Sequence, residues 1–174
     1  MEIRPTIYIG YDSPHPEGYI ACKNSITYHS GEIKIEPLIL SDLSYLIPDK
    51  TDGSTEFTYT RFLVPYLNNF TGVAIFCDSD FIFLDSIQNL LECIDVSLPV
   101  NVVQHKDYTP KSGIKMNNKQ QSHYPRKNWS SLIVWNCDHI LNKQYLTPEN
   151  INNTSPSSLH RFKWIDDSLI GNID

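Results

Sequence analysis

The chain has 174 residues, of which 40% are hydrophobic and 20% charged, as is ordinary for one soluble globular domain. Its net charge of −6 argues against a general binder of nucleic acid or anionic membranes, because both need a large basic face. No apolar run approaches the ~20 residues of a membrane-spanning helix, and the first ten residues lack a leader pattern. We therefore expect a cytoplasmic protein with a small-molecule partner.

Strand and helix patterns alternate along the first half of the chain. The expected elements are a strand at 5–10, a helix at 16–30, a strand at 33–40, a helix at 56–64 and a strand at 73–77. Ser54 or Thr55 is the expected cap of the helix at 56–64, and Pro65 is expected to end it. Later strands are predicted at 98–104 and 131–135, with helix starts at 138–145 and 147–149.

This order predicts an α/β fold, with parallel early strands covered by helices. In open α/β sheets, ligands bind beyond the carboxyl ends of the strands. Residues 10–13 and 78–80 follow two predicted strands, so both segments are expected on one edge of the sheet. The four cysteines are far apart and form no C-x-x-C pair. We therefore expect buried free thiols rather than a zinc site or disulfides.

A basic segment interrupts the acidic chain between residues 104 and 128. It contains one acid, Asp107, and six basic residues: Lys106, Lys111, Lys115, Lys119, Arg126 and Lys127. A long basic loop suits a phosphorylated ligand, although a solvated surface excursion has the same composition. The residues around Trp129 either line a donor or acceptor pocket, by stacking on sugar or phosphate, or anchor the loop.

The most informative motif is Asp78-Ser79-Asp80, which lies between a buried strand and a second apolar run. Two aspartates at this spacing are a weak signal alone, because the chain has thirteen. Their position adds information, since burying a carboxylate costs several kcal/mol unless a cation compensates it. Oxygen ligands suit Mg²⁺ or Mn²⁺, which bridge diphosphate oxygens.

The motif stands in a longer block that resembles a known family. Residues 58–67, then Gly72 and residues 76–80, are similar in order and spacing to the T-Y-x-R, P-x-L and D-x-D block of nucleotide-sugar glycosyltransferases with the GT-A fold. The nearest resemblance is to family eight, which contains glycogenin and bacterial lipopolysaccharide galactosyltransferases. Residues 10–12 resemble the family's donor-base loop, residues 128–136 loosely resemble the stretch after the donor-sugar contacts, and residues 164–170 resemble its late D-Q-D-x-L element.

The resemblance implies a single GT-A domain over residues 1–174 with a mixed Rossmann-like sheet. It also implies sugar transfer from a nucleoside-diphosphate sugar, such as a UDP-sugar, to a glycan, lipid or protein hydroxyl, with retention and a divalent cation. Asp78 and Asp80 would hold Mn²⁺ or Mg²⁺ against the diphosphate, and Asp166 or Asp167 would act at the sugar. The implied donor contacts are Gly10, Tyr11, Asp12, Tyr59, Arg61, Ser79 and Asn128 beside the two metal ligands. The implied acceptor or phosphate loop holds His105, Lys115, Arg126, Lys127 and Trp129.

Several of these residues have a structural alternative. Arg61 is either a phosphate ligand or part of an ion pair, Asp12 either contacts the base or caps the next helix, and Tyr59 and Phe62 suit the core whatever the function. The histidines at 105, 123, 139 and 160 are more often structural than ligands.

Two other functions stay open. One is a haloacid-dehalogenase-type phosphatase, which also places D-x-D after an apolar strand. The other is a non-catalytic module that binds nucleotide sugars or glycans, since the family's C-terminal segment, with its third metal ligand, has no counterpart before Asp174.

Overall fold

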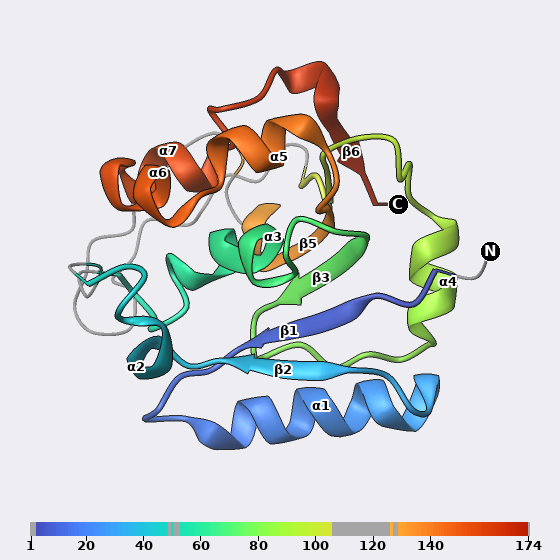
Figure 1. Ribbon diagram of the computed structural model, residues 1–174. Helices are drawn as coiled ribbons and strands as arrows, with labels where there is room; N and C mark the ends of the chain where they lie inside the picture. The colour runs from blue at the N-terminus through green and yellow to red at the C-terminus, as the bar shows by residue number, and fades with distance from the viewer. Residues whose placement is uncertain (1–2, 49, 51–52, 106–125, 127–128, 174) are drawn as a thin grey trace.

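A computed structural model describes residues 3–48, 50, 53–105, 126 and 129–173, and every structural statement below concerns these residues. They form three layers, a six-stranded sheet with helices on both faces (Figure 1). The strands are β1 (Thr6–Gly10), β2 (Ile35–Leu38), β3 (Val73–Cys77), β4 (Val100–Val102), β5 (Leu132–Asn136) and β6 (Ile170–Asn172).

The sheet is mixed, with the strand order β2-β1-β3-β5-β4-β6. β1 pairs in parallel with β2 and β3, and β4 pairs in parallel with β6. β5 is antiparallel to both of its neighbours, β3 and β4. The predicted α/β class and the parallel early strands are therefore confirmed.

The α-helices are short except for the first. They are α1 (Pro16–Ser30), α2 (Leu40–Leu43), α3 (Val64–Leu67), α4 (Ile87–Glu92), α5 (Ile140–Tyr145), α6 (Pro148–Asn153) and α7 (Pro156–His160). The 3₁₀ helices are η1 (Thr60–Leu63), η3 (Trp129–Ser131) and η4 (Asp167–Leu169). None of the helices in the described residues is long and apolar enough to cross a bilayer.

The alternation of side chains along the strands divides the core into two parts. On one face, Ile7, Ile9 and Ile75 pack with Cys22 and Ile26 of α1 and with residues of α4. On the other face, the core contains alternate residues of the same strands together with residues of η1, α3, α6 and α7. The central strands are therefore buried on both faces, which explains their nearly continuous apolar sequences.

The strand and helix predictions are largely confirmed for β1, α1, β3, β5, α5 and α6, with small differences in their ends. β2 and β4 are shorter than predicted, and Leu40 already begins α2. β6 was not predicted, because three residues are too few to show a period.

The predicted helix over 56–64 is wrong. In its place are a turn, η1 and α3, and Pro65 lies in the first turn of α3 rather than after the end of a helix. Residues 57–65 are all buried. Because this segment has no exposed face, the spacing of its apolar residues carries no information about a helical period. Proline in the first turn of a helix loses no hydrogen bond, which explains its position.

The four cysteines are free. Cys22, Cys77 and Cys137 are buried as expected, whereas Cys93 is exposed, which corrects that part of the prediction. The sulfur atoms of Cys22 and Cys77 lie 3.7 Å apart between α1 and β3. This contact and burial raise the pKa of Cys77 well above its ordinary value, so Cys77 packs as a neutral thiol.

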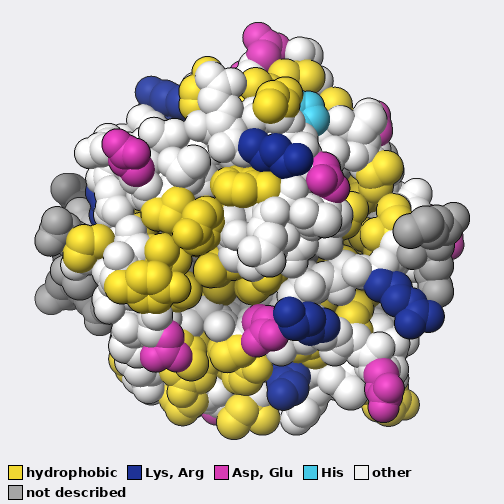
Figure 2. All heavy atoms as spheres, viewed as in Figure 1, with side chains coloured by type: hydrophobic (Ala, Val, Ile, Leu, Met, Phe, Trp, Pro, Cys, Tyr) yellow, Lys and Arg dark blue, Asp and Glu magenta, His cyan; other side chains and the backbone are white. Residues whose placement is uncertain are grey.

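Apolar side chains also reach the surface. Figure 2 shows them gathered on the left of the face that carries α3. Tyr45 and Tyr66 are among the exposed large apolar residues, at 76% and 38% exposure.

Candidate functional site

The candidate site lies where β1 and β3 end. The two strands are parallel, with Ile9 opposite Cys77, so the chain leaves both at the same edge of the sheet (Figure 1). Residues 10–13 and 78–80 are therefore neighbours at this edge, as the sequence predicted.

The antiparallel strand β5 brings a third segment to the same edge. Its first residue, Leu132, pairs with Cys77, and the Asp78 backbone N–H donates to the carbonyl of Ser131 at 2.9 Å. The start of β5 and η3 therefore lie against the two aspartates. Ser79 packs on the opposite side, where a β-carbon added at Gly18 of α1 would lie 3.2 Å from its carbonyl oxygen.

Arg61 holds this edge together from η1. Its side chain is only 6% exposed and its Nη1 lies 2.9 Å from Asp78 Oδ1. Nε donates to the Phe57 carbonyl at 3.0 Å, and Nη1 donates to the Ser130 carbonyl at 2.7 Å. The guanidinium also lies over the rings of Phe57 and Phe76, at 5.2 and 4.8 Å from their centroids. The ion-pair interpretation of Arg61 is thus realised, and the pair is buried rather than on the surface.

Asp78 is a carboxylate in an apolar setting. Burial raises its pKa above the ordinary value of 3.8, and nearby Asp80 raises it further, whereas Arg61 and a hydrogen bond with Ser131 lower it. Asp78 Oδ1 is itself buried and lies 2.9 Å from Arg61 Nη1. A buried carboxylate oxygen needs a compensating cation, and the guanidinium of Arg61 supplies one.

The carboxylate oxygens of Asp78 and Asp80 are ligands of the kind that a divalent cation prefers. Asp80 is exposed, so it presents its carboxylate to solvent beside the partly buried Asp78. Within the described residues, no group of three His, Cys, Asp or Glu side chains is arranged to hold a metal. Mg²⁺ commonly uses one or two carboxylates, with water and substrate phosphate in its other positions, so Asp78 and Asp80 would suffice with a diphosphate.

The raised pKa of Asp78 predicts a pH-dependent stability. The folded protein keeps a proton on this carboxyl at pH values where the unfolded chain has lost it, which favours the fold at low pH. Relative to Asp78→Asn, the free energy of unfolding of the wild type is expected to fall as the pH rises above 3.8 through the raised pKa. Urea denaturation of both proteins from acidic to neutral pH measures this difference, and a rise with pH would contradict the assignment.

The loop after β1 is tied to the segment before η1. Asp12 Oδ1 accepts a hydrogen bond from the Glu56 N–H at 3.2 Å, and the Glu56 carboxylate accepts one from the Ser13 N–H at 3.1 Å. The capping alternative for Asp12 is wrong, because His15 is the N-cap residue of α1 and its N–H meets only the Asp12 backbone carbonyl. Tyr11 packs edge-on against Tyr19, with ring centroids 5.7 Å apart.

Two predicted donor contacts are buried. Gly10 provides room for the Phe57 ring, since an added β-carbon would lie 2.5 Å from it. Tyr59 is 2% exposed and Phe62 0%, and both belong to the core, in agreement with the structural alternative for these two residues.

The late acidic element, Asp166 and Asp167, faces Arg126 of the basic segment. Arg126 forms an ion pair with Asp167 and donates to the Arg161 carbonyl at 2.5 Å. Its guanidinium lies over the ring of Trp129, which is half-buried against the core. Arg126 therefore links η3 to η4, and an anchored loop end accounts for it.

Asp166 caps η4. Its Oδ1 accepts hydrogen bonds from the Ser168 N–H at 3.0 Å and from the Ser168 hydroxyl at 2.7 Å. These bonds lower the pKa of Asp166, so it stays ionised and is a weak base. The structure places both Asp166 and Asp167 on the exposed surface. Asp167 pairs with Arg126, which comes before η3, and Ser130 of η3 accepts a hydrogen bond from Arg61.

His160 supports the site from behind, a role that its sequence position did not reveal. Its Nε2 donates to the Thr58 carbonyl at 3.1 Å and its Nδ1 lies 2.6 Å from Ser130 Oγ. Since the Ser130 carbonyl accepts from Arg61, His160 holds the residue that positions the guanidinium. Of the other predicted residues, His105 is exposed after β4, and Lys115, Lys127 and Asn128 lie outside the described residues.

No family model matches the chain. A curated relative, "Protein CDI" of Arabidopsis thaliana, is 43% identical over 172 residues, which are 96% of this chain and 66% of the relative. The chain therefore spans just under two thirds of that protein.

Solved structures with a similar fold include the bifunctional glycosyltransferase WbbM. The TM-score is 0.63 and the identity 15%, over 99% of this chain and 39% of that one. The glycosyltransferase GlyE of Streptococcus pneumoniae follows, with a TM-score of 0.56, 9% identity, and coverage of 99% of this chain and 46% of that one. The chain has a glycosyltransferase-like fold. In this glycosyltransferase-like fold, the edge with Asp78 and Asp80 is the carboxyl edge at which ligands of α/β sheets bind.

Proposed function

We propose that this chain is the catalytic domain of a glycosyltransferase that uses a nucleoside-diphosphate sugar, a UDP-sugar first among the candidates. The observation that carries the proposal is the pair of aspartates at the carboxyl edge of β3, one held in an ion pair with the buried Arg61 and the other exposed to solvent. The glycosyltransferase-like fold supports it independently. In this proposal the acceptor is a hydroxyl of a glycan, lipid or protein.

Asp78 and Asp80 would hold Mn²⁺ or Mg²⁺ between themselves and the donor diphosphate. A cation there supplies Lewis-acid assistance to the leaving nucleotide. Arg61 opposes the rise in the pKa of Asp78 and fixes its carboxylate, through contacts with Asp78, Phe57 and Ser130. The carboxylate is thus positioned before the ligand arrives, which reduces the cost of ordering it on binding.

The late acidic element would serve the sugar. Asp166 is ionised and exposed, so it can stabilise positive charge that develops at the anomeric carbon. Asp167 is paired with Arg126, and a donor phosphate would compete with Asp167 for this guanidinium. Retention of configuration is part of the proposal through the resemblance to family eight, and the anomeric signal of the product checks it.

The test is calorimetric titration of UDP and GDP into the wild type, with and without Mn²⁺. Tighter binding with Mn²⁺ is expected, and Asp80→Asn is expected to weaken it at least about tenfold, because removing a charged partner costs about 1.5–3 kcal/mol. Asp80 is exposed, so this variant should fold. Glu92→Gln, at another exposed acid, the last residue of α4, is the matched control and should bind as the wild type does.

The outcomes separate the candidate functions. Mn²⁺-dependent binding together with UDP-sugar hydrolysis supports the transferase. Binding without turnover of any donor supports the non-catalytic module. Failure to bind either nucleotide with any metal would overturn the donor site, and a trapped aspartyl-phosphate would favour the phosphatase alternative.

A further inference from the structure

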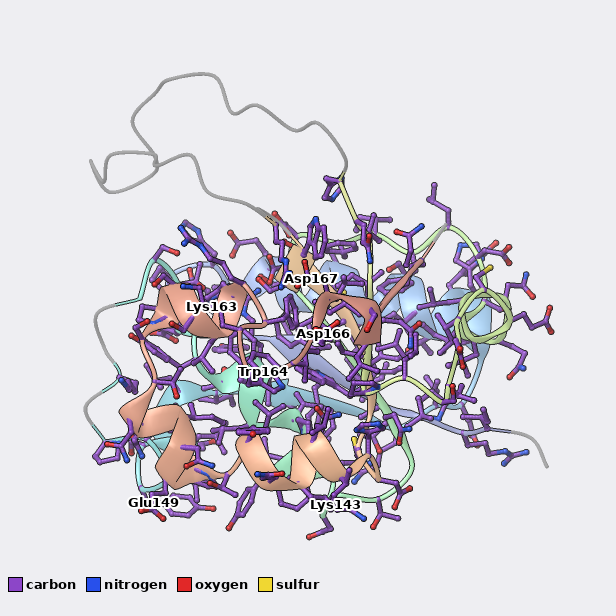
Figure 3. The ribbon with its side chains drawn as sticks, turned by 90° about the horizontal axis from the view of Figure 1, so that it is seen from above. Lys143, Glu149, Lys163, Trp164, Asp166 and Asp167 are labelled. Atoms are coloured by element: carbon purple, nitrogen blue, oxygen red, sulfur yellow. The ribbon has the colours of Figure 1, made fainter. Side chains whose placement is uncertain are left out.

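A pocket lies between α5, α6, α7 and the segment that follows α7, and residues 10–13, 61 and 78–80 do not line it. Its volume is about 430 Å³, within the ~300–1,000 Å³ of small-ligand sites. Buried Leu146 and Leu159 form part of its wall. Figure 3 looks onto this side of the molecule, with Trp164 near the centre and α5 to α7 around it.

The polar groups of the pocket are held in place by hydrogen bonds to the backbone. The Asn150 side-chain amide donates to the Gln144 carbonyl at 2.9 Å, and that of Asn153 donates to the Glu149 carbonyl at 3.0 Å. The amide oxygens of both residues accept no hydrogen bond that the described residues provide. Ser158 Oγ accepts from Ser155 Oγ at 3.0 Å, so its own proton can be donated. The pocket thus offers oriented acceptors and a donor.

Two aromatic rings line the same pocket, those of Tyr145 and Trp164. Tyr145 is 39% exposed, so part of its ring surface is open to a ligand. Trp164 is fixed from behind, because its ring packs on Phe62 at 5.9 Å and on Trp135 at 6.5 Å. A rigid ring loses little freedom when a ligand packs on it.

The pocket has no acidic group that would attract a cationic ligand. Among the described residues, Lys163 is the one charged residue that lines it, and no carboxylate does. Glu149 and Lys143 lie at the outer edge of α6 and α5, away from Trp164 (Figure 3). Lys163 is exposed, so its charge is screened and it acts mainly as a hydrogen-bond donor.

We propose that this pocket binds a carbohydrate residue of a glycan. Sugar hydroxyls pair with oriented amide and hydroxyl groups, and the C–H face of a sugar ring packs on aromatic side chains, so the lining matches both surfaces of a hexose. The inference does not depend on the proposed function, because the pocket could hold a glycan whether or not the chain transfers sugars.

The experiment is a titration of the ¹⁵N-labelled chain with methyl glycosides of glucose, galactose, mannose and N-acetylglucosamine, followed by NMR. At least one glycoside is expected to shift the side-chain amide signals of Asn150 and Asn153 and the indole signal of Trp164. Tyr145→Ala should raise the dissociation constant about threefold to tenfold, since a stacked ring contributes that much. Asn153→Ala, on the exposed side of α6, is a second variant and should weaken binding as well.

The controls separate this pocket from the donor site. Tyr28→Ala removes an aromatic side chain that is 84% exposed on α1 and should leave glycoside binding unchanged. Asp80→Asn should also leave it unchanged, even if it abolishes nucleotide binding. The proposal would be overturned if no glycoside shifted the signals of the pocket residues. It would also be overturned if Tyr145→Ala and Asn153→Ala both bound the glycoside as tightly as the wild type does.

Discussion

Replacing Arg61 by methionine is expected to lower the free energy of unfolding by about 3–5 kcal/mol, the cost of leaving a buried charge without its partner. Methionine fills a similar volume between the rings of Phe57 and Phe76, so lost packing contributes little. The guanidinium contacts with Asp78, Phe57 and Ser130 are all lost. Urea denaturation at neutral pH measures the change.

A double-mutant cycle tests whether Asp78 is the reason. Asp78→Asn in the Arg61→Met background removes the unpaired carboxylate, so the double variant should be less destabilised than the sum of the single variants. Lys23→Met replaces an exposed cation on α1 and should change the free energy of unfolding by no more than about 0.5 kcal/mol. Additive changes at Arg61 and Asp78 would show that their contact is not energetically coupled.

Phe62→Ala is expected to cost a similar amount, about 3–5 kcal/mol, because it leaves a cavity in a close-packed cluster. Phe62 is fully buried and meets four rings edge to face, those of Trp135, His160, Phe162 and Trp164. Thermal or urea unfolding measures the loss.

Two other variants control for Phe62→Ala. Phe62→Leu keeps most of the volume and should lose clearly less stability. Tyr28→Ala removes an aromatic ring from the surface and should be nearly neutral. A loss below about 1 kcal/mol for Phe62→Ala would mean that the surrounding rings collapse into the space.

The sequence predicted the fold well where side-chain patterns are long or strong. β1, α1 and β3 follow directly from an apolar run, a helical pattern with proline in its first turn and a second apolar run. Residues 57–65 could not be predicted in this way, because all of them are buried and a segment without an exposed face shows no period. β6 depends on pairing with β4, a long-range contact that a three-residue pattern does not encode.

The site was predictable in its position and less so in its contacts. The edge shared by residues 10–13 and 78–80 follows from the parallel pairing of β1 and β3. That Arg61 faces Asp78 rather than solvent depends on β5 running antiparallel and delivering Ser130 to the same place. His160 is 30 residues from Ser130 in the chain, and no local pattern connects them.

The stacking of Trp135 on Trp164 has a consequence for spectroscopy. Two indoles with centroids 6.5 Å apart and planes 24° from parallel are close enough for their electronic transitions to couple, which gives a paired signal in circular dichroism. One of these chromophores belongs to the central strand β5 and the other lines the pocket beside α5 to α7. The circular dichroism signal of this tryptophan pair therefore reports, without a label, how the sheet packs against the wall of that pocket. A change in the position of either indole would alter it.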